Sequence, residues 1–195
     1  MILVVDHYDS FTYNLVQLIE SLGAETEVVK SDAEPARALV ARGADAIVLS
    51  PGPGRPEDAG CFTELLRLLP HETPVLGVCL GHQAMGVVAG ARVERATPVH
   101  GKASLVHHDG SGILAGLPDP FEAGRYHSLV VAREGLPDEL EITAWSDDDL
   151  VMAAQHRGLP RFGVQFHPES ILTPDGPTVV RNFLALTRHR AGSRA

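Results

Sequence analysis

Cys79 lies in a segment whose residues could place a reactive side chain on a sharp turn. An apolar run at positions 75–78 leads into the cysteine, and a helix is expected to begin soon after it. Gly77 and Gly81 leave room for the crowded backbone of such a nucleophile elbow. The positive end of the helix dipole would favour a thiolate at this point. Taken alone, the segment also fits a buried cysteine that packs as a small apolar residue.

His167 and Glu169 could supply the base and the orienting carboxylate that a thiol nucleophile needs. They belong to the run Phe166-His167-Pro168-Glu169-Ser170, which follows an apolar segment expected to be a strand. In extended backbone, side chains two residues apart point to the same side, so the carboxylate could hold the imidazole in one tautomer. The same run could also form an ordinary surface turn. The pair therefore predicts a catalytic triad only in combination with Cys79.

The loop Pro51-Gly52-Pro53-Gly54 is a candidate for contacting a substrate. It follows the third expected strand, and in a parallel sheet it would lie at the same edge as Cys79, where such folds bind ligands. Pro53 has no N–H group, so a backbone donor must come from Gly52 or Gly54. The loop matches neither phosphate-binding pattern, GxxxxGK[ST] or GxGxxG. An ordinary Pro/Gly turn would have the same sequence.

Strand and helix patterns alternate through the first half of the chain. Short apolar runs predict strands at 2–5, 26–29, 46–49 and 75–78. Helical patterns lie between and after them, at 11–22, 35–42, 62–69 and 81–89. Asp9 or Ser10 is expected to cap the first helix. This alternation predicts a parallel sheet with helices on both faces.

The second half has shorter strands separated by Gly, Pro and Asp turns. The expected strands are 103–106, 128–132, 141–144, 151–154 and 162–165. They suggest hairpins added to the sheet edge, followed by a closing helix at 178–189 and a frayed tail at 190–195. We therefore expect one α/β domain over residues 1–195. It has an open, mostly parallel mixed sheet, helices on both faces and antiparallel edge strands.

Composition and charge exclude several classes of partner. The chain has 16 basic and 25 acidic residues, a net charge of −9, which argues against nucleic acid as the main partner. A membrane span is not expected, because the sequence has no apolar run of about 18 residues. The first residues lack the pattern of a signal peptide, so a cytoplasmic protein is expected. Cys61 and Cys79 form no CxxC pair and are expected to be free thiols.

The ten histidines do not form a pattern typical of a metal site. The HExxH motif is absent, and the adjacent His107 and His108 would face apart in a strand. Most histidines are expected at the surface. Neither a metal nor an organic cofactor is expected in this chain.

Several segments together resemble the triad-type, or class I, glutamine amidotransferases over essentially the whole chain. The first set is Pro51-Gly52-Pro53-Gly54, Cys79-Leu80-Gly81-His82-Gln83 and His167-Pro168-Glu169. A second set resembles the small subunit of anthranilate synthase and, equally well, the glutaminase subunit of aminodeoxychorismate synthase. That set is Asp9-Ser10-Phe11, His100-Gly101-Lys102, Arg125-Tyr126-His127-Ser128-Leu129 and Gly163-Val164-Gln165-Phe166-His167-Pro168-Glu169-Ser170. His7 departs from the resemblance, because an asparagine is expected there.

The resemblance implies a flavodoxin-like amidotransferase fold and a role for each motif residue. Cys79 would attack the side-chain amide of L-glutamine and form a thioester, while the N–H groups of Leu80 and Gly52 bind the oxyanion. His167 would protonate the departing ammonia and then activate water, oriented by Glu169. The implied glutamine and oxyanion contacts are Gly52, Pro53, Gly54, Leu80, Gln83, Ser128 and Leu129. For His82 a packing or hydrogen-bonding role is expected.

The resemblance also implies a separate, larger, chorismate-binding synthase subunit that receives the ammonia. It leaves open the tryptophan branch, the folate branch, or a subunit shared by both. His100 and Lys102 are expected near the partner interface. A stand-alone cysteine hydrolase is one alternative, but Gln83 with Ser128 and Leu129 suits a glutamine side chain better than a peptide. A non-enzymatic binding subunit is the other, and the intact triad argues against it.

Overall fold

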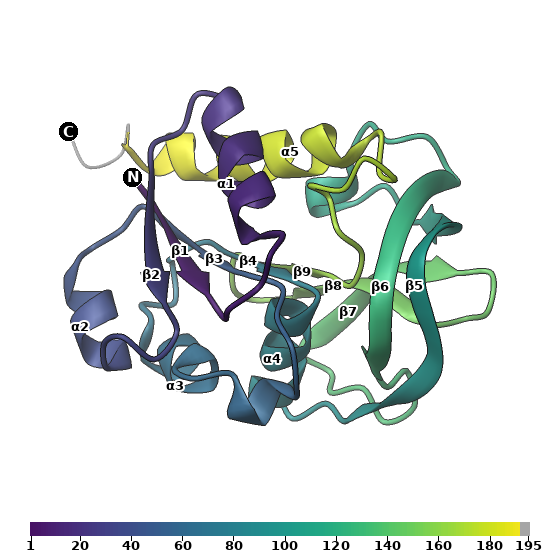
Figure 1. Ribbon diagram of the computed structural model, residues 1–195, viewed down its shortest axis with the longest axis horizontal. Coiled ribbons are helices and arrows are strands. Elements are labelled where there is room, and N and C mark those ends of the chain that lie inside the picture. Colours follow the sequence, from purple (N-terminus) through teal and green to yellow (C-terminus); the bar gives the residue numbers. More distant parts are fainter. Residues whose placement is uncertain (192–195) are drawn as a thin grey trace.

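The computed structural model describes residues 1–191, with the side chains at 99, 100 and 188–191 outside the description. Within this range the strands form one nine-stranded sheet in the order β2-β1-β3-β4-β9-β8-β7-β5-β6 (Figure 1). The frayed tail expected at 190–195 falls mainly outside the described residues, and so does the side chain of His100. No helix in residues 1–191 combines the length and the apolar character needed to cross a bilayer.

The parallel part of the sheet positions the proposed nucleophile. Its strands are β1 (Ile2–Asp6), β2 (Thr26–Lys30), β3 (Ala46–Leu49), β4 (Val75–Val78) and β9 (Arg161–Val164). Every residue of β1, β3 and β4 is buried, as expected for strands covered by helices on both faces. The predicted parallel sheet is thereby confirmed.

The antiparallel part extends the sheet beyond β9. It contains β5 (Val93–His108), β6 (Phe121–Val131), β7 (Leu140–Ser146) and β8 (Val151–His156). Antiparallel strands are added as predicted, but the strand expected at 162–165 is not one of the edge hairpins: it is β9, which pairs in parallel with β4 inside the sheet. The strands β5 and β6 are also much longer than the runs at 103–106 and 128–132. Much of the first half of β5 is polar and exposed, and its register with β6 shifts twice between Arg95 and Lys102. These irregularities remove the alternation of apolar and polar residues from which a strand is predicted.

Helices cover both faces of the sheet (Figure 1). On one face α1 (Thr12–Ser21) packs beside α5 (Gly176–Ala191), burying residues such as Leu15, Ile19 and Phe183. The opposite face is covered by α2 (Ala36–Ala41), α3 (Phe62–Leu68) and α4 (Leu80–Val88). Two short 3-10 helices, η1 (Pro56–Asp58) and η2 (Gly112–Leu114), lie in the connections.

The start of α1 differs from the prediction. Phe11, not Asp9 or Ser10, occupies the N-cap position, and it makes no side-chain capping bond. The Asp9 carboxylate instead accepts a hydrogen bond from the Phe11 N–H at 2.7 Å, which forms a turn just before the helix. The hydroxyl of Thr12 donates to the buried Asp6 carboxylate at 2.8 Å. The polar side chains therefore stabilise the turn between β1 and α1, and they do not cap the helix itself.

Candidate active site

Cys79 stands between β4 and α4 in a conformation that few residues other than glycine adopt. Its φ and ψ are 51° and −98°, and α4 begins at the next residue, Leu80. Such backbone strain costs on the order of 1–3 kcal/mol and is often found at catalytic sites. The elbow is tied to the sheet, because the Cys79 N–H donates to the Val164 carbonyl at 2.8 Å. The side chain is 7% exposed, so the sulfur is both constrained and largely shielded.

Close packing explains why glycines flank the elbow. A Cβ atom at Gly77 would lie 2.5 Å from the carbonyl carbon of Gly81. A Cβ atom at Gly81 would lie 2.5 Å from the carbonyl oxygen of Leu49, in β3. Both obstacles are backbone atoms, which cannot move aside as a flexible side chain can. The two glycines therefore allow α4 to start directly against the sheet.

His167 and Glu169 form a buried pair in the segment that follows β9. The distance from His167 Nδ1 to Glu169 Oε1 is 2.7 Å, and the two side chains are 3% and 0% exposed. Burial by itself would lower the pKa of His167. Hydrogen bonds and negative charge from Cys79 and Glu169 outweigh burial and raise this pKa to about 10. The imidazolium form is therefore favoured beside the Glu169 carboxylate, and the buried Nε2 atom of the ring has no hydrogen-bond partner among the described residues.

Aromatic rings and β6 fix the orientation of the imidazole. The rings of Phe11 and Tyr126 contact His167 edge-on, with centroids 5.6 and 5.0 Å from its own. The His167 N–H donates to the Gly124 carbonyl at 3.2 Å, and the Thr173 hydroxyl donates to the His167 carbonyl at 2.7 Å. The base thus has fixed backbone and side-chain neighbours from both halves of the chain.

A cavity of about 170 Å³ opens beside Cys79 and brings the predicted substrate residues together. Its lining contains Gly52, Pro53, Gly54, Cys79, Leu80, Gln83, Tyr126, His127, Ser128 and Leu129. The loop after β3, the first turn of α4 and the middle of β6 therefore meet at one place. His167 and Glu169 are not part of this lining. Sequence reasoning did not include Tyr126 and His127, although both lie in the motif that contributed Ser128 and Leu129.

Gln165 is a further site residue that sequence reasoning missed. It is fully buried, and its Nε2 atom donates to the Cys79 Sγ atom at 3.4 Å. Its Oε1 atom accepts from Gln83 Nε2 at 3.1 Å, and the same Gln83 nitrogen donates to the Leu129 carbonyl at 2.9 Å. The two amides thus connect the sulfur with the wall of the cavity. A polar residue at the end of an otherwise apolar strand was the available signal.

His7, where the family resemblance suggested asparagine, supports the Pro51–Gly54 loop from below. Its N–H donates to Ser50 Oγ and its Nδ1 atom hydrogen bonds with Ser31 Oγ, both at 2.8 Å. A Cβ atom at Gly52 would lie 2.8 Å from the His7 carbonyl oxygen. The histidine at position 7 therefore affects the packing beneath the loop. It does not line the cavity, which is formed there by Gly52, Pro53 and Gly54.

Half of the histidines with described side chains are buried, although most histidines were expected at the surface. His82, His108, His127 and His167 are buried, and of the eight histidines with described side chains only His71 is exposed. The four buried histidines lie on different elements: His82 in α4, His108 at the end of β5, His127 in β6 and His167 after β9. Residues 1–191 contain no group of three or more His, Cys, Asp or Glu side chains that could hold a metal ion.

Two of the buried histidines beside the site are neutral. Burial, followed by the effect of His127, lowers the pKa of His82 to about 3. Burial, followed by the charges of Arg125 and His167, lowers the pKa of His127 to about 4. Arg125 Nε donates to His127 Nε2 at 3.2 Å, which fixes this nitrogen as an acceptor. His82 packs against Gly163, where an added Cβ atom would lie 2.3 Å from its Nδ1 atom.

Comparisons with known proteins agree with this geometry. The family model described as glutamine amidotransferase class-I matches residues 3–186. Anthranilate synthase component 2 from Mycobacterium tuberculosis is 52% identical over 187 residues, which are 94% of this chain and 81% of the relative. Aminodeoxychorismate synthase from Streptomyces griseus is also 52% identical, over 200 residues that cover 99% of this chain and 27% of the relative.

A solved structure shares both the fold and part of the sequence. It is described as a GMP synthase subunit from Thermoplasma acidophilum, with a TM-score of 0.88 and 28% sequence identity. The match covers 99% of this chain and 96% of the other chain. With the family model spanning nearly all of the sequence, the chain belongs to the class-I glutamine amidotransferase family.

Proposed function

We propose that this chain is the glutaminase subunit of a chorismate-aminating synthase, with anthranilate synthase as the first candidate. The observation that carries the proposal is that Cys79, on its strained elbow at the wall of a small cavity, is close enough to the buried His167–Glu169 pair to raise the pKa of His167. This arrangement provides the three groups of a catalytic triad: a nucleophile, an imidazole that carries the proton, and a carboxylate that orients the imidazole.

In the first step the Cys79 thiolate attacks the side-chain amide carbon of glutamine. A carbon–sulfur bond forms, and the electron pair of the carbonyl moves to its oxygen. The N–H groups of Leu80 and Gly52 are the proposed oxyanion donors. Leu80 is the first residue of α4, where the N–H groups have no partner within the helix, and both residues line the cavity.

In the second step the His167 imidazolium gives its proton to the amide nitrogen, and the carbon–nitrogen bond breaks. Ammonia leaves, and a thioester remains on Cys79. The neutral His167 then removes a proton from water, which attacks the thioester and releases glutamate and the thiolate. Glu169 keeps the ring oriented through both transfers and stabilises its charged form. These steps use only side chains, backbone N–H groups and water, so we propose that this chain needs no cofactor.

The ammonia must reach an acceptor before it is lost to water, so we propose a larger chorismate-binding synthase as partner, in the cytoplasm. The names of the relatives support this, since several are called component 2 or beta subunit. The Streptomyces griseus protein supports it differently, because the region matching this chain occupies only 27% of its length. A glutaminase region can therefore form part of a longer synthase chain. That relative also makes aminodeoxychorismate synthase the second candidate.

The test is reconstitution with each synthase subunit in turn. The mixture receives chorismate with either glutamine or an ammonium salt, and anthranilate and aminodeoxychorismate are measured separately. Cys79→Ala should abolish product formation from glutamine and leave product formation from ammonia unchanged. Cys61→Ala is the matched control, because Cys61 is also buried and free but lies at the start of α3. Glutamine-dependent product from Cys79→Ala would refute the assignment.

A further inference from the structure

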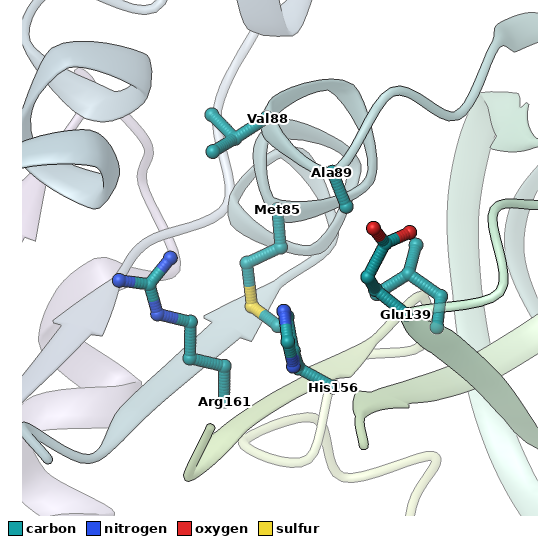
Figure 2. Close-up of a pocket in the computed structure, with 7 residues that line it drawn as sticks. Met85, Val88, Ala89, Glu139, His156 and Arg161 are labelled. Atoms are coloured by element: carbon teal, nitrogen blue, oxygen red, sulfur yellow. The ribbon is translucent and has the colours of Figure 1, made fainter. Parts of the chain in front are cut away.

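A second cavity, of about 250 Å³, is lined by residues from the end of α4 and from the strands β7, β8 and β9 (Figure 2). It lies below the last turns of α4, where Met85 and Val88 contribute to its wall. Arg161, at its other side, pairs with Val75 at the beginning of β4, whereas Cys79 follows the end of that strand. The cavity is therefore separated from the proposed glutaminase site by the length of β4 and α4.

Arg161 lines this cavity, and the Nε atom of its guanidinium is unpaired among the described residues. The residue is 7% exposed. None of the ion pairs found within residues 1–191 includes it, and burial lowers the pKa of its guanidinium. A buried charge without a partner is costly, so most such groups are paired with an opposite charge. Among the described residues, no carboxylate pairs with the guanidinium of Arg161.

His156 adds a second donor to the same cavity. Its Nδ1 atom accepts hydrogen bonds from the N–H groups of Gly158 and Leu159, at 3.0 and 3.2 Å. Burial, followed by the charge of Arg161, lowers the pKa of His156, which favours the neutral ring. With Nδ1 used as an acceptor, the neutral ring carries its proton on Nε2. His156 therefore offers one N–H donor in the cavity lining, on the other side of the Met85 side chain from Arg161 (Figure 2).

The other walls select the kind of anion. Met85, Val88 and Leu140 are apolar, and the volume of about 250 Å³ lies just below the range of roughly 300–1,000 Å³ typical of drug-sized ligands. Figure 2 shows the guanidinium of Arg161 on one side of Met85 and the carboxylate of Glu139 on the other. Glu139 and the net charge of −9 oppose any anion, and they oppose a dianion such as phosphate more strongly than a single negative charge. A single negative charge on a small apolar body fits these walls best.

We propose that this cavity is a binding site for a small monocarboxylate with an apolar body, separate from the glutamine site. Arg161 binds the carboxylate as the charged partner that the protein itself does not provide, and His156 donates a second hydrogen bond. Met85, Val88 and Leu140 cover the apolar body.

The test titrates the full chain with benzoate and observes the methionine methyl groups by carbon-13 NMR. The chain contains three methionines, of which Met85 lines the cavity, while Met1 and the fully buried Met152 serve as internal references. Benzoate should shift the Met85 signal in a saturable manner. Benzamide, which has the same shape without the charge, should bind about tenfold or more weakly. Inorganic phosphate should also bind more weakly than benzoate.

Two arginine variants separate this site from a general charge effect. Arg161→Leu should weaken benzoate binding about tenfold or more, and its glutaminase activity in the assembled synthase should stay unchanged. Arg157→Leu is the matched control, because Arg157 is exposed and already paired with Glu141. It should bind benzoate as the unmodified chain does. An unmoved Met85 signal, equal binding of benzamide, tighter binding of phosphate, or an equal loss in both variants would each overturn the proposal. The comparison of acid and amide needs no variant, so it decides the matter even if Arg161→Leu does not fold.

Discussion

Glu169 influences the reaction through the charge it places beside His167. The carboxylate is fully buried and lies 2.7 Å from the imidazole, and it contributes to raising the pKa of His167 to about 10. A group with a raised pKa keeps its proton until the pH approaches that value. Because the imidazolium is the proposed proton donor to the departing ammonia, the alkaline limit of glutaminase activity should follow this pKa.

Glu169→Gln should therefore move the alkaline limb of the glutaminase pH profile to lower pH. The amide can still hydrogen bond to the ring, but it cannot stabilise the imidazolium by charge. We also expect kcat/KM near neutral pH to fall by roughly 10²–10⁴. The measurement is kcat/KM against pH in the assembled synthase. Glu122→Gln, at an exposed position of β6, is the control. An unchanged alkaline limb in Glu169→Gln would contradict this role.

Gln165 offers a separate prediction, because its amide donates to the sulfur of Cys79 at 3.4 Å. Gln165→Leu keeps a similar volume but removes that donor and the acceptor used by Gln83. A hydrogen bond to a charged group contributes about 1.5–3 kcal/mol, so kcat/KM should fall by roughly 10- to 150-fold. The rate of Cys79 alkylation by iodoacetamide should change in parallel. Gln155→Leu, on β8, tests whether loss of any partly buried amide has the same effect.

At the scale of single residues, the sequence was informative where a motif carried the information. Cys79, His167 and Glu169 form a strong pattern because thiol chemistry needs a nucleophile, a base and an orienting carboxylate, and each of these residues can fill one of the three roles. Gln165 was not predicted, because a polar residue at the end of an apolar strand does not by itself indicate that its amide reaches a sulfur 86 positions away. The contact depends on how the ends of β4 and β9 lie side by side, which is a property of the folded sheet.

Element α4 connects the site with the core, and its start depends on a close approach to β3. A Cβ atom at Gly81 would meet the Leu49 carbonyl oxygen at 2.5 Å, whereas one at Gly86 would meet the Val131 side chain at 2.9 Å. Gly81→Ala should therefore lower the free energy of unfolding by about 1–3 kcal/mol through overpacking. It should also lower glutaminase activity, because Cys79 and Leu80 would shift.

Gly86→Ala is the matched substitution, since it lies in the same helix but meets a side chain that can rotate. Its cost should be smaller, partly offset by the better helix propensity of alanine, about 1 kcal/mol. Urea denaturation of both variants, with activity measured in the assembled synthase, compares the two positions. Equal losses of stability and activity in the two variants would show that the close approach of Gly81 to β3 does not determine the effect.

The elements of the parallel half could be predicted because burial on both faces produces continuous apolar runs. The boundaries of β3 and β4 agree with the predicted ranges of 46–49 and 75–78. The strand β5 could not be predicted in full, because its first half is exposed and its pairing is interrupted. Its structure depends on hydrogen bonds to β6, not on a local pattern of side chains.

At the scale of the whole molecule, the site lies where the two halves of the chain meet. The first half supplies Cys79 and the Pro51–Gly54 loop, and the second supplies His167, Glu169 and the β6 wall. The strand β9 joins these halves, since it pairs in parallel with β4 and antiparallel with β8. Sequence position alone does not indicate that the last strand lies in the middle of the sheet. The packing at this junction buries His82 and His127.

These two histidines make the stability of the whole protein sensitive to mild acid. Their pKa values are lowered to about 3 and about 4, while an unfolded histidine titrates near 6.5. The stability that depends on both histidines being neutral is therefore fully present above about pH 6.5. It is lost as the pH falls, because the unfolded chain binds protons that the folded chain cannot accept. Between pH 6.5 and 5, each histidine should lower the free energy of unfolding by up to about 1.4 kcal/mol per pH unit.

Urea denaturation of the full chain at pH 7, 6, 5.5 and 5 measures this slope. His82→Gln and His127→Gln should each flatten it by up to about 1.4 kcal/mol per pH unit, whatever their effect on stability at pH 7. His71→Gln is the control, because His71 is exposed and its substitution should leave the slope unchanged. A slope that persists in the double variant would mean that other groups bind the protons. The acid sensitivity would then not come from the junction where the two halves form the site.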